Sequence, residues 1–531
     1  MSGRRILRGV GASWFLTLSR ALVNLSLVPL FYAYLPKPVL GAWLAFAALA
    51  NFVHMSDPGL SFVAIRALAF HRGRRDHGTV DPDGLDPQLL QAKPADLVHT
   101  VSGLYWRIAL VLVAASAGFG WWYLGSTGLD PAALPGVRGA WLVYAVGFAV
   151  TIAGQTPNLV LQGLGDVGLD SAFQAVALWL GLAANLACLK AGFGIFGLAC
   201  VYLVQGSAVR LGLWWMVKAR HAWVLEGRGR YQRALAKVML VEGRGMLMTQ
   251  LGNLLTYQAA PLALVWSLGP QALPDYNSLW VLALYGNQVG GALGPALIPF
   301  IVARRAQGDA EGIRRLHSLC LKCVLGFQVL WAAFLLAGAP VLLQLWIGPG
   351  HFVGWGILAL FITYNFLDQQ QAAHGYFAWT AKRWPFGRWT LAAGLLTGPL
   401  VLAGVAWLGL PGAALGALTA QLLTNDGVVV KRTLDIIQVP WTRYLGKVLL
   451  RVLLLGALLA LAGFTARDLC AAWAWPAVTL RGVGLDRVGP VAAAGLAAGL
   501  AALALGWGFL LDGVERAWVA ERWRAWRKAG A

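Results

Sequence analysis

The fold of this chain is decided by stretches such as residues 170–217, which read DSAFQAVALWLGLAANLACLKAGFGIFGLACVYLVQGSAVRLGLWWMV. Two apolar stretches, 170–190 and 193–217, are separated here by a short break around Gly192. An α-helix rises about 1.5 Å per residue, so about 20 apolar residues cross the hydrocarbon core of a bilayer. Each stretch is long enough to span a membrane, and the short break predicts an antiparallel pair of transmembrane helices.

Stretches of this kind recur along all 531 residues. We predict about fourteen spans, at residues 10–35, 39–64, 98–124, 139–162, 170–190, 193–217, 238–267, 273–303, 316–345, 353–380, 388–409, 411–430, 445–466 and 490–511. Hydrophobic residues make up 59% of the chain and charged residues 12%, whereas a soluble domain has roughly 25% charged residues. The sequence therefore predicts an all-α polytopic membrane protein with almost no soluble domain.

Lys and Arg give the chain a formal net charge of +20 and concentrate in every second connector. The basic groups lie at Arg4, Arg5 and Arg8, in connectors 71–96 and 218–237, at Arg304, Arg305, Arg314 and Arg315, at Lys431 and Arg432, and in the C-terminal tail. The positive-inside rule places these connectors and both termini in the cytoplasm, which requires an even number of spans. The net charge is thus a topology signal, and we predict no nucleic-acid partner.

The motifs that would indicate a cofactor or a metal are weak. Of the five Cys, only Cys320 and Cys323 have CxxC spacing, and no second ligand pair accompanies them. Residues 163–168 match GxGxxG but fall between two predicted spans, without the strand of a dinucleotide-binding unit. We find no P-loop pattern, and we predict no cofactor and no metal site.

A weak internal repeat indicates two halves. Residues 35–43 align with residues 268–276, and each segment joins a long helix with scattered polar residues to the next helix. We predict an N-lobe at 1–217, a basic cytoplasmic linker at 218–237, a C-lobe at 238–430, and two more helices with a basic amphipathic cytoplasmic tail at 431–531. Such repeats are typical of secondary transporters. Chance similarity of two apolar hairpins is the alternative.

Several short stretches occur in a characteristic order and spacing. They are Val28–Leu35, Leu40–Trp43, Ser56–Ser61 followed by Arg66, Gln250–Asn253, Leu268–Gly269 with Tyr276, Ala303–Asp309, and Leu345–Gly348. Over roughly residues 5–430 the chain resembles the polysaccharide transporter family. This family comprises the O-antigen-type flippases of the multidrug/oligosaccharidyl-lipid/polysaccharide exporter superfamily. Relatives often carry an acidic residue near Ala259 and Ala260, where this chain has none.

The resemblance implies a two-lobed, V-shaped transporter in the bacterial inner membrane. Such a protein moves a polyprenyl-diphosphate-linked oligosaccharide from the cytoplasmic to the outer leaflet, and a cationic central cavity holds the head group. The implied partners are this lipid-linked oligosaccharide, membrane lipids, and polysaccharide polymerase or assembly proteins.

Polar side chains deep in spans cost free energy and therefore indicate function or specific structure. Arg20 lies about 15 Å along the first span, and Asn24 follows one turn later on the same face. The guanidinium can donate two parallel hydrogen bonds to a diphosphate. The alternative is that Arg20 pairs with a buried carboxylate for structure alone.

Further polar residues in the spans complete the predicted site. The predicted substrate-binding residues are Arg20, Asn24, Asn51, His54, Asn253, Asn287, Gln288, Asn365 and Gln369. The predicted coupling or gating residues are Asp57, Asp368, Glu242 and Arg244. For Asp57 the alternative is a cap on a helix broken by Pro58. For Glu242 and Arg244 it is a local ion pair.

Our leading hypothesis is a flippase for a lipid-linked oligosaccharide that works by alternating access and has no catalytic residues. The main alternative is a drug/cation antiporter of the same superfamily, which would need a cavity dominated by carboxylates. A membrane glycosyltransferase or polymerase is a third hypothesis. It is disfavoured because the acidic motif at Asp81 and Asp83 lies in a polar connector rich in Pro and Gly. A scaffold for a cell-envelope complex is a fourth.

Overall fold

The structure is a computed structural model that describes residues 3–54, 59–77, 86–126, 136–291, 293–379, 386–513, 515–517 and 520. The chain divides into two compact units, Met1–Pro274 and Asp275–Ala531. The predicted lobe boundary at 218–237 lies earlier in the chain than this division. The reason is that α10 (Arg233–Leu268) packs against α2, α3 and α5, so it remains in the first unit.

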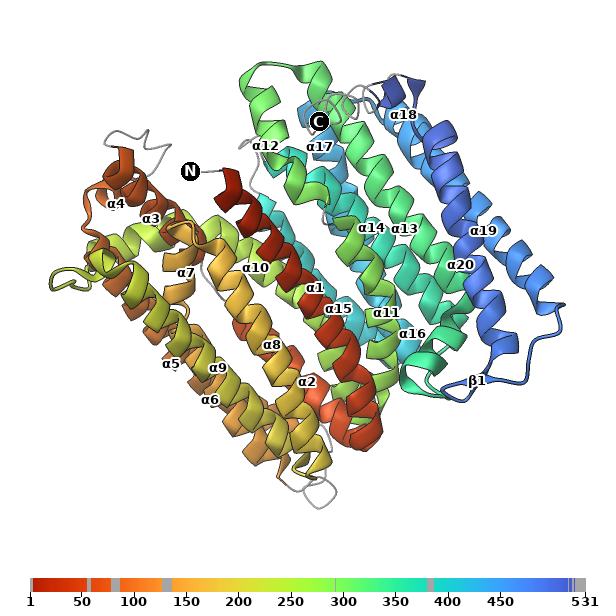
Figure 1. Ribbon diagram of the computed structural model, residues 1–531, viewed down its shortest axis with the longest axis horizontal. Coiled ribbons are helices and arrows are strands. Elements are labelled where there is room, and N and C mark those ends of the chain that lie inside the picture. The colour runs from red at the N-terminus through yellow and green to blue at the C-terminus, as the bar shows by residue number, and fades with distance from the viewer. Residues whose placement is uncertain are drawn as a thin grey trace. The chain divides into compact units, whose positions relative to one another are not determined.

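The first unit is built from long helices (Figure 1). They are α1 (Gly3–Tyr34), α2 (Lys37–His54), α3 (Leu60–His77), α4 (Pro87–Gln91), α5 (Pro94–Ser126), α6 (Val137–Ala153), α7 (Thr156–Gly163), α8 (Val167–Lys190), α9 (Gly194–Arg220), the 3₁₀ turns η1 (Ala222–Leu225) and η2 (Pro270–Ala272), and α10. Within this unit α1 packs on α8, α8 on α9, α9 on α6, and α6 on α5. The pairs α8–α9 and α5–α6 are neighbours in sequence, as short connectors favour, whereas α1–α8 and α6–α9 join helices that are far apart in the chain.

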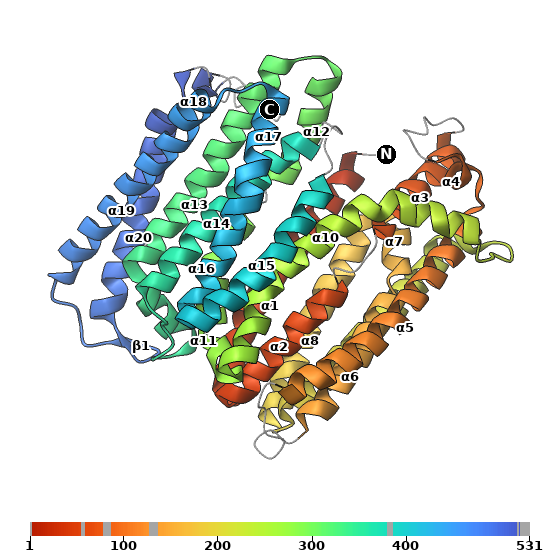
Figure 2. The ribbon, with the colours of Figure 1, turned by 180° about the vertical axis from the view of Figure 1, so that it is seen from behind.

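The second unit begins with α11 (Leu273–Gly291), whose first two residues precede its boundary. It continues with α12 (Leu293–Ala306), α13 (Ala310–Ile347), α14 (Trp355–Trp379), α15 (Phe386–Leu408), α16 (Leu410–Gln421), the π-helical η3 (Leu422–Val430), α17 (Lys431–Ile437), α18 (Trp441–Tyr444), π-helical η4 (Leu445–Leu449), α19 (Leu450–Ala471), β1 (Thr479–Leu480), β2 (Val483–Gly484), α20 (Leu485–Leu505) and π-helical η5 (Gly506–Leu510). Helices α13, α19 and α20 pack side by side, as Figure 2 shows.

Ten helical segments in the described part of the chain are long and apolar enough to cross a membrane. The segments are Phe15–Tyr34, Pro94–Ser126, Val137–Gly163, Val167–Lys190, Gly194–Arg220, Ala310–Ile347, Gly387–Leu408, Leu410–Ile437, Trp441–Ala471 and Leu485–Leu510. The remaining four predicted spans coincide with α2 and α3, α10, α11 and α12, and α14. These four are also helical, and they carry most of the polar residues singled out from the sequence. The expected fold class, an all-α polytopic membrane protein, is confirmed.

Three predicted spans are each divided between two helices: 139–162 into α6 and α7, 273–303 into α11 and α12, and 39–64 into α2 and α3. Residues 39–64 were expected to form one helix, but α2 ends at His54 and α3 begins at Leu60. Gly59 has a positive φ of 75°, and a methyl group there would lie within 3 Å of the backbone of Gly243. A residue with a side chain is disfavoured at such a position. Two helices thus replace the single helix, and Gly59, just before the second of them, packs tightly against Gly243 of α10.

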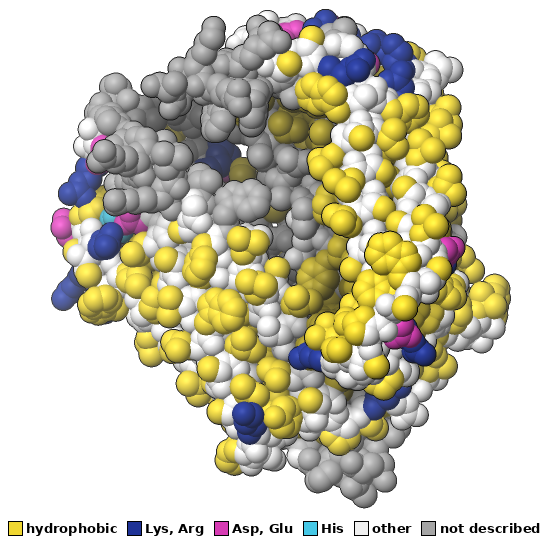
Figure 3. All heavy atoms as spheres, turned by 45° about the vertical axis from the view of Figure 1, so that its right-hand side comes forward, with side chains coloured by type: hydrophobic (Ala, Val, Ile, Leu, Met, Phe, Trp, Pro, Cys, Tyr) yellow, Lys and Arg dark blue, Asp and Glu magenta, His cyan; other side chains and the backbone are white. Residues whose placement is uncertain are grey.

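Large apolar side chains cover the outer faces of the helices, as Figure 3 shows for one side of the molecule. Leu211 and Trp215 on α9 are each 70% exposed, Trp407 on α15 is 84% exposed, and Leu503 on α20 is 75% exposed. Apolar patches of this extent are rare on soluble monomers. Lipid is the environment that these faces match.

Glycines bring α15 and α16 into close contact. A methyl group at Gly412 would overlap the carbonyl oxygen of Gly404, and one at Gly416 would overlap that of Leu400. Small residues four apart allow such approaches between helices in lipid. At Gly398 on α15, in contrast, a methyl group would meet nothing within 4 Å.

This contrast predicts different effects of the same substitution. Gly412→Val is expected to lower the melting temperature in detergent and the yield of folded protein, because the two backbones must separate. The expected loss is about 1–3 kcal/mol, typical of overpacking. Gly398→Val serves as the control and should leave the melting temperature close to that of the wild type. Equal melting temperatures for the two variants would contradict the close packing of α15 and α16.

Candidate functional site

A buried carboxylate organises the polar interior of the first unit. Asp170, in the first turn of α8, is only 1% exposed. Its Oδ1 accepts from the amides of Asn158 at 2.8 Å and Gln174 at 2.9 Å, and its Oδ2 accepts from Gln162 at 2.9 Å. Three amide donors thus satisfy a charge that would otherwise be costly to bury.

The local sequence explains this arrangement. Asn158 and Gln162 are four residues apart on α7, and Asp170 and Gln174 are four residues apart on α8, so each pair shares a helix face. The turn between them contains Gly165 with a positive φ of 72°. The GxGxxG segment at 163–168 therefore lies between two helices, as predicted. It turns the chain so that the two polar faces meet.

Two arginines extend this network. Arg20 donates from Nη2 to Gln174 Oε1 at 3.1 Å, and Arg210 on α9 donates to Asn158 Oδ1. Arg20 is exposed, and next to it Trp179 Nε1 donates to Ser19 Oγ at 3.2 Å. Arg20 therefore reaches the carboxylate of Asp170 only through an amide. Its guanidinium retains donors for another group.

The partner of Arg20 fixes its position along the neighbouring helix. Gln174 is the eighth residue of α8, hence about 10 Å from the start of a helix of 24 residues. The predicted depth of Arg20 in the membrane stays a prediction.

Among the described side chains, those of Asn24, Asn51 and Asn253 make no hydrogen bond to this network. Asn24 and Asn51 are exposed, and Asn253 is half-buried on α10. His54 is the last residue of α2, its side chain is outside the described part of the structure, and Asp57 lies outside the described residues. Their predicted roles stay predictions.

The predicted gating residues Glu242 and Arg244 are both exposed on α10. Glu242 Oε1 accepts from the backbone N–H of Asp86 at 3.3 Å, in the connector before α4. Among the described residues no ion pair joins Glu242 to Arg244. The contact of Glu242 is therefore with this connector, and a gating role for either residue stays a prediction.

Several second-unit candidates do meet. Asn287 on α11 donates from Nδ2 to Asn365 Oδ1 at 2.7 Å and to Asp368 Oδ2 at 3.3 Å. Asn365 is fully buried and donates to the carbonyl oxygen of Phe361 at 2.8 Å. Gln369, 7% exposed, lies one turn after Asn365 on α14. Gln288, in contrast, is exposed.

Asp426, in the π-helical segment η3, is a second carboxylate that contacts α14. Gln370 Nε2 donates to Asp426 Oδ1 at 3.1 Å, and Asn425 Nδ2 donates to Gln421 Oε1 at 2.8 Å. A π-helical turn changes the direction of side chains relative to an α-helix and is frequent at functional sites. Asp426 was missed in the sequence, although it lies within the predicted span 411–430 and an acidic residue in a span is itself a signal.

Buried acceptor oxygens surround these groups. Among the described residues, Asn287 Oδ1, Gln369 Oε1, Gln370 Oε1 and Asp426 Oδ2 have no hydrogen-bond partner within the protein. Buried oxygens of this kind normally accept from water, a proton donor or a cation. The second unit thus combines two carboxylates, Asp368 and Asp426, with free acceptors, a composition suited to a proton or cation.

This fold is similar to that of several solved structures, although no sequence comparison finds a relative. No protein-family model matches the chain, and no curated protein sequence matches it. Several solved structures match the chain. The chain is similar to an inward-facing conformation of a multidrug resistance MATE family transporter of the MOP superfamily, with a TM-score of 0.61 and 16% identity over 78% of this chain and 95% of that chain.

Two further structures agree. An outward-facing MATE family transporter has a TM-score of 0.53 and 16% identity over 82% of this chain and 95% of that chain. A mutant of the Vibrio cholerae MATE transporter VcmN has a TM-score of 0.55 and 16% identity over 82% and 97%. This protein is thus a multi-pass membrane protein with the fold of MATE transporters. The predicted resemblance to the polysaccharide transporter family, and to the superfamily that contains it, stays a prediction.

Proposed function

We propose that this chain is a transporter of the MOP superfamily that moves an amphipathic cargo across a bacterial inner membrane by alternating access. The observation that carries the proposal is the fold. The structural alignment covers 95% of the length of an inward-facing transporter and 95% of the length of an outward-facing one. These neighbours are transporters rather than enzymes. Movement of cargo requires no bond to be made or broken, so the proposal includes no catalytic residues.

The solved structures favour drug/cation antiport more directly than transport of a lipid-linked oligosaccharide. The first of them is described as a multidrug resistance transporter. The chain also has carboxylates that a cation antiporter needs, because Asp368 lies in α14 and Asp426 lies in the segment Leu410–Ile437 of spanning length. Asp170, in contrast, already accepts from three amides. Buried carboxylates in spans are costly unless they bind cations or take up protons.

A flippase for a polyprenyl-diphosphate-linked oligosaccharide is the second candidate, and Arg20 favours it. Its exposed guanidinium lies in an apolar span and uses one donor on Gln174. A planar cation suits a diphosphate and repels cationic drugs. A membrane potential that is negative inside would favour outward movement of the anion by about 2.3 kcal/mol per charge per 100 mV. Polymerase or assembly proteins would then be partners.

One experiment separates the two cargoes. Cells that lack the gene would be compared with the wild type for the leaflet distribution of polyprenyl-linked saccharide and for sensitivity to organic cations. A flippase predicts saccharide accumulation in the inner leaflet with unchanged drug sensitivity. An antiporter predicts greater drug sensitivity with a normal saccharide distribution. No change in either measurement would contradict the transport proposal for both cargo classes.

Substitution of Arg20 then tests its role in the flippase. Arg20→Ala is expected to cause inner-leaflet accumulation at normal protein levels, since a charge-assisted hydrogen bond contributes about 1.5–3 kcal/mol, or roughly 10- to 150-fold in affinity. Arg20→Lys should restore part of the activity because it keeps the charge. Arg487→Ala, which removes an exposed cation elsewhere, serves as the control. A wild-type distribution in Arg20→Ala would remove Arg20 as a ligand.

A further inference from the structure

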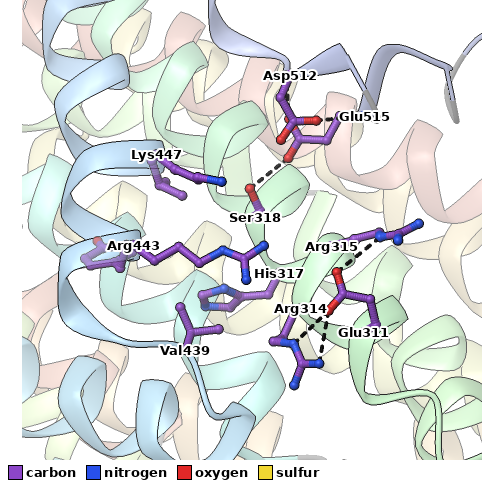
Figure 4. A pocket seen from close by; sticks show the side chains of 12 residues that line it. Glu311, Arg314, Arg315, His317, Ser318, Val439, Arg443, Lys447, Asp512 and Glu515 are labelled. Atoms are coloured by element: carbon purple, nitrogen blue, oxygen red, sulfur yellow. Dashed lines mark hydrogen bonds and ion pairs between the residues drawn. The ribbon is translucent and has the colours of Figure 1, made fainter.

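A pocket of about 190 Å³ lies within the second unit, between the start of α13, the α18–η4 segment and the residues after η5 (Figure 4). A water molecule occupies about 30 Å³ of the liquid. The volume therefore corresponds to about six waters, which is enough for a phosphate group with part of its hydration shell. The lining of the pocket includes none of the polar residues on α11 and η3 described above.

The acidic side chains of this pocket already have partners. Glu311 pairs with Arg314 at 3.0 Å and with Arg315 at 3.3 Å. Glu515 pairs with the buried Lys322 at 2.6 Å and accepts from Ser318 Oγ at 2.7 Å. Asp512 Oδ1 accepts from the backbone N–H of Glu515 at 2.9 Å. These carboxylates are therefore engaged in holding α13 and the segment after η5.

Two cations of the pocket have no such partner. Arg443 and Lys447 are four residues apart on the continuous α18–η4 helix, and Figure 4 shows both side chains pointing toward Ser318 and His317. Within the described part of the chain, neither side chain has a hydrogen bond or an ion pair. They are exposed. The carboxylates of Glu311, Asp512 and Glu515 also line the pocket, but they contact other groups. Two adjacent positive charges that make no ion pair of their own favour an anion there.

Two buried polar groups also line the pocket. His317 is 2% exposed and Tyr444 is 1% exposed. Among the described residues, neither His317 Nε2 nor the hydroxyl of Tyr444 has a hydrogen-bond partner. Buried polar atoms are nearly always paired. The two groups therefore offer hydrogen-bonding capacity beside the two cations, which is the arrangement expected of a binding site for an oxyanion.

The position of the pocket indicates the source of the anion. It lies at the helix ends that carry Arg314, Arg315 and Arg443, which the positive-inside rule assigns to the cytoplasmic leaflet. On the same α18–η4 helix, Trp441 is 42% exposed and Leu445 is 45% exposed. An aromatic and an aliphatic side chain beside a basic pocket are typical of the lipid interface, where basic pockets between helices bind anionic head groups.

We propose that this pocket binds the phosphate group of an anionic lipid head group, with Arg443 and Lys447 as its charged ligands and His317 and Tyr444 as its buried ones. A soluble phosphate has the same chemistry, but the exposed Trp441 and Leu445 favour a lipid. The proposal concerns a site within one unit and does not depend on which cargo the protein transports.

The test uses the full-length protein in bilayers of phosphatidylcholine that contain a minor share of phosphatidylglycerol. Native mass spectrometry of the released protein counts the phosphatidylglycerol molecules retained. The wild type is expected to retain this lipid in preference to phosphatidylcholine. The double variant Arg443→Gln/Lys447→Gln is expected to lose affinity about 25-fold, since each cation near a membrane surface contributes roughly fivefold. Arg432→Gln is the matched control, because Arg432 is exposed on α17 outside the pocket.

Tyr444→Phe gives an independent measurement. It removes the hydroxyl without changing the charge, so it should weaken retention several-fold while the melting temperature in pure phosphatidylcholine does not fall. Equal loss in Arg432→Gln and in the double variant would mean a diffuse surface charge effect and would overturn the proposal. Inorganic phosphate that stabilises the protein in pure phosphatidylcholine as strongly as phosphatidylglycerol does would overturn the lipid as source.

Discussion

Asp170→Leu is expected to lower the free energy of unfolding by about 2–5 kcal/mol. The substitution leaves the amides of Asn158, Gln162 and Gln174 without their acceptor in a nearly closed site. An unsatisfied buried donor costs about 1–3 kcal/mol in soluble proteins, and hydrogen bonds between membrane helices average about 0.6 kcal/mol. Three donors at the membrane value give about 2 kcal/mol, and the larger cost in soluble proteins sets the upper part of the stated range.

The measurement is unfolding of the purified protein in detergent, by heat and by denaturant. Asp170→Asn should lie between the wild type and Asp170→Leu, because it keeps one acceptor oxygen but places an amide donor against another donor. Asp468→Leu is the control: it removes the same charge where the side chain is 67% exposed. If Asp170→Leu and this control have the same melting temperature, Asp170 does not organise the first unit.

Removing one partner of the buried Lys322–Glu515 pair is the second large effect. The two side chains are 1% and 6% exposed, and Nζ lies 2.6 Å from Oε2. Breaking a buried pair leaves an uncompensated charge and typically costs about 3–5 kcal/mol. Glu515→Leu should reach this range, since Ser318 loses its acceptor as well.

The double variant Lys322→Met/Glu515→Leu makes this prediction specific. Replacement of both charges by apolar groups of similar size is often neutral, so the double variant should recover most of the stability lost in either single variant. The exposed pair of Arg467 and Asp468 provides the comparison, because surface pairs contribute about 0–1 kcal/mol. Additive losses in the double variant would show that the ion pair is not what stabilises these helices.

The sequence anticipated part of the candidate site. Asn365, Asp368 and Gln369 were singled out as polar residues within one predicted span, and their spacing places them on one face of a helix. The structure brings Asn287 to Asn365 and Asp368, as a shared site requires. Asp170 and Asp426 were missed. Asp170 lies at the edge of its span, and the importance of Asp426 depends on Gln370 of a different helix.

The sequence by itself determined the class of this protein. The length of its apolar stretches and the distribution of Lys and Arg follow from the bilayer, which requires every backbone polar group in lipid to be satisfied within a helix. These constraints act on each span separately, so they can be recognised in one stretch at a time. That is why the helical, multi-pass fold was predicted from local composition.

Only the tertiary structure decided which polar residues belong together. Helical periodicity assigns a side chain to a face, but the neighbour of that face depends on how whole helices pack. Arg20 thus reaches Asp170 through Gln174, and Arg443 and Lys447 converge on His317 of α13, more than a hundred residues earlier in the chain. Small residues such as Gly404 and Gly412 act at the same level, because they allow close approach only between the particular helices α15 and α16.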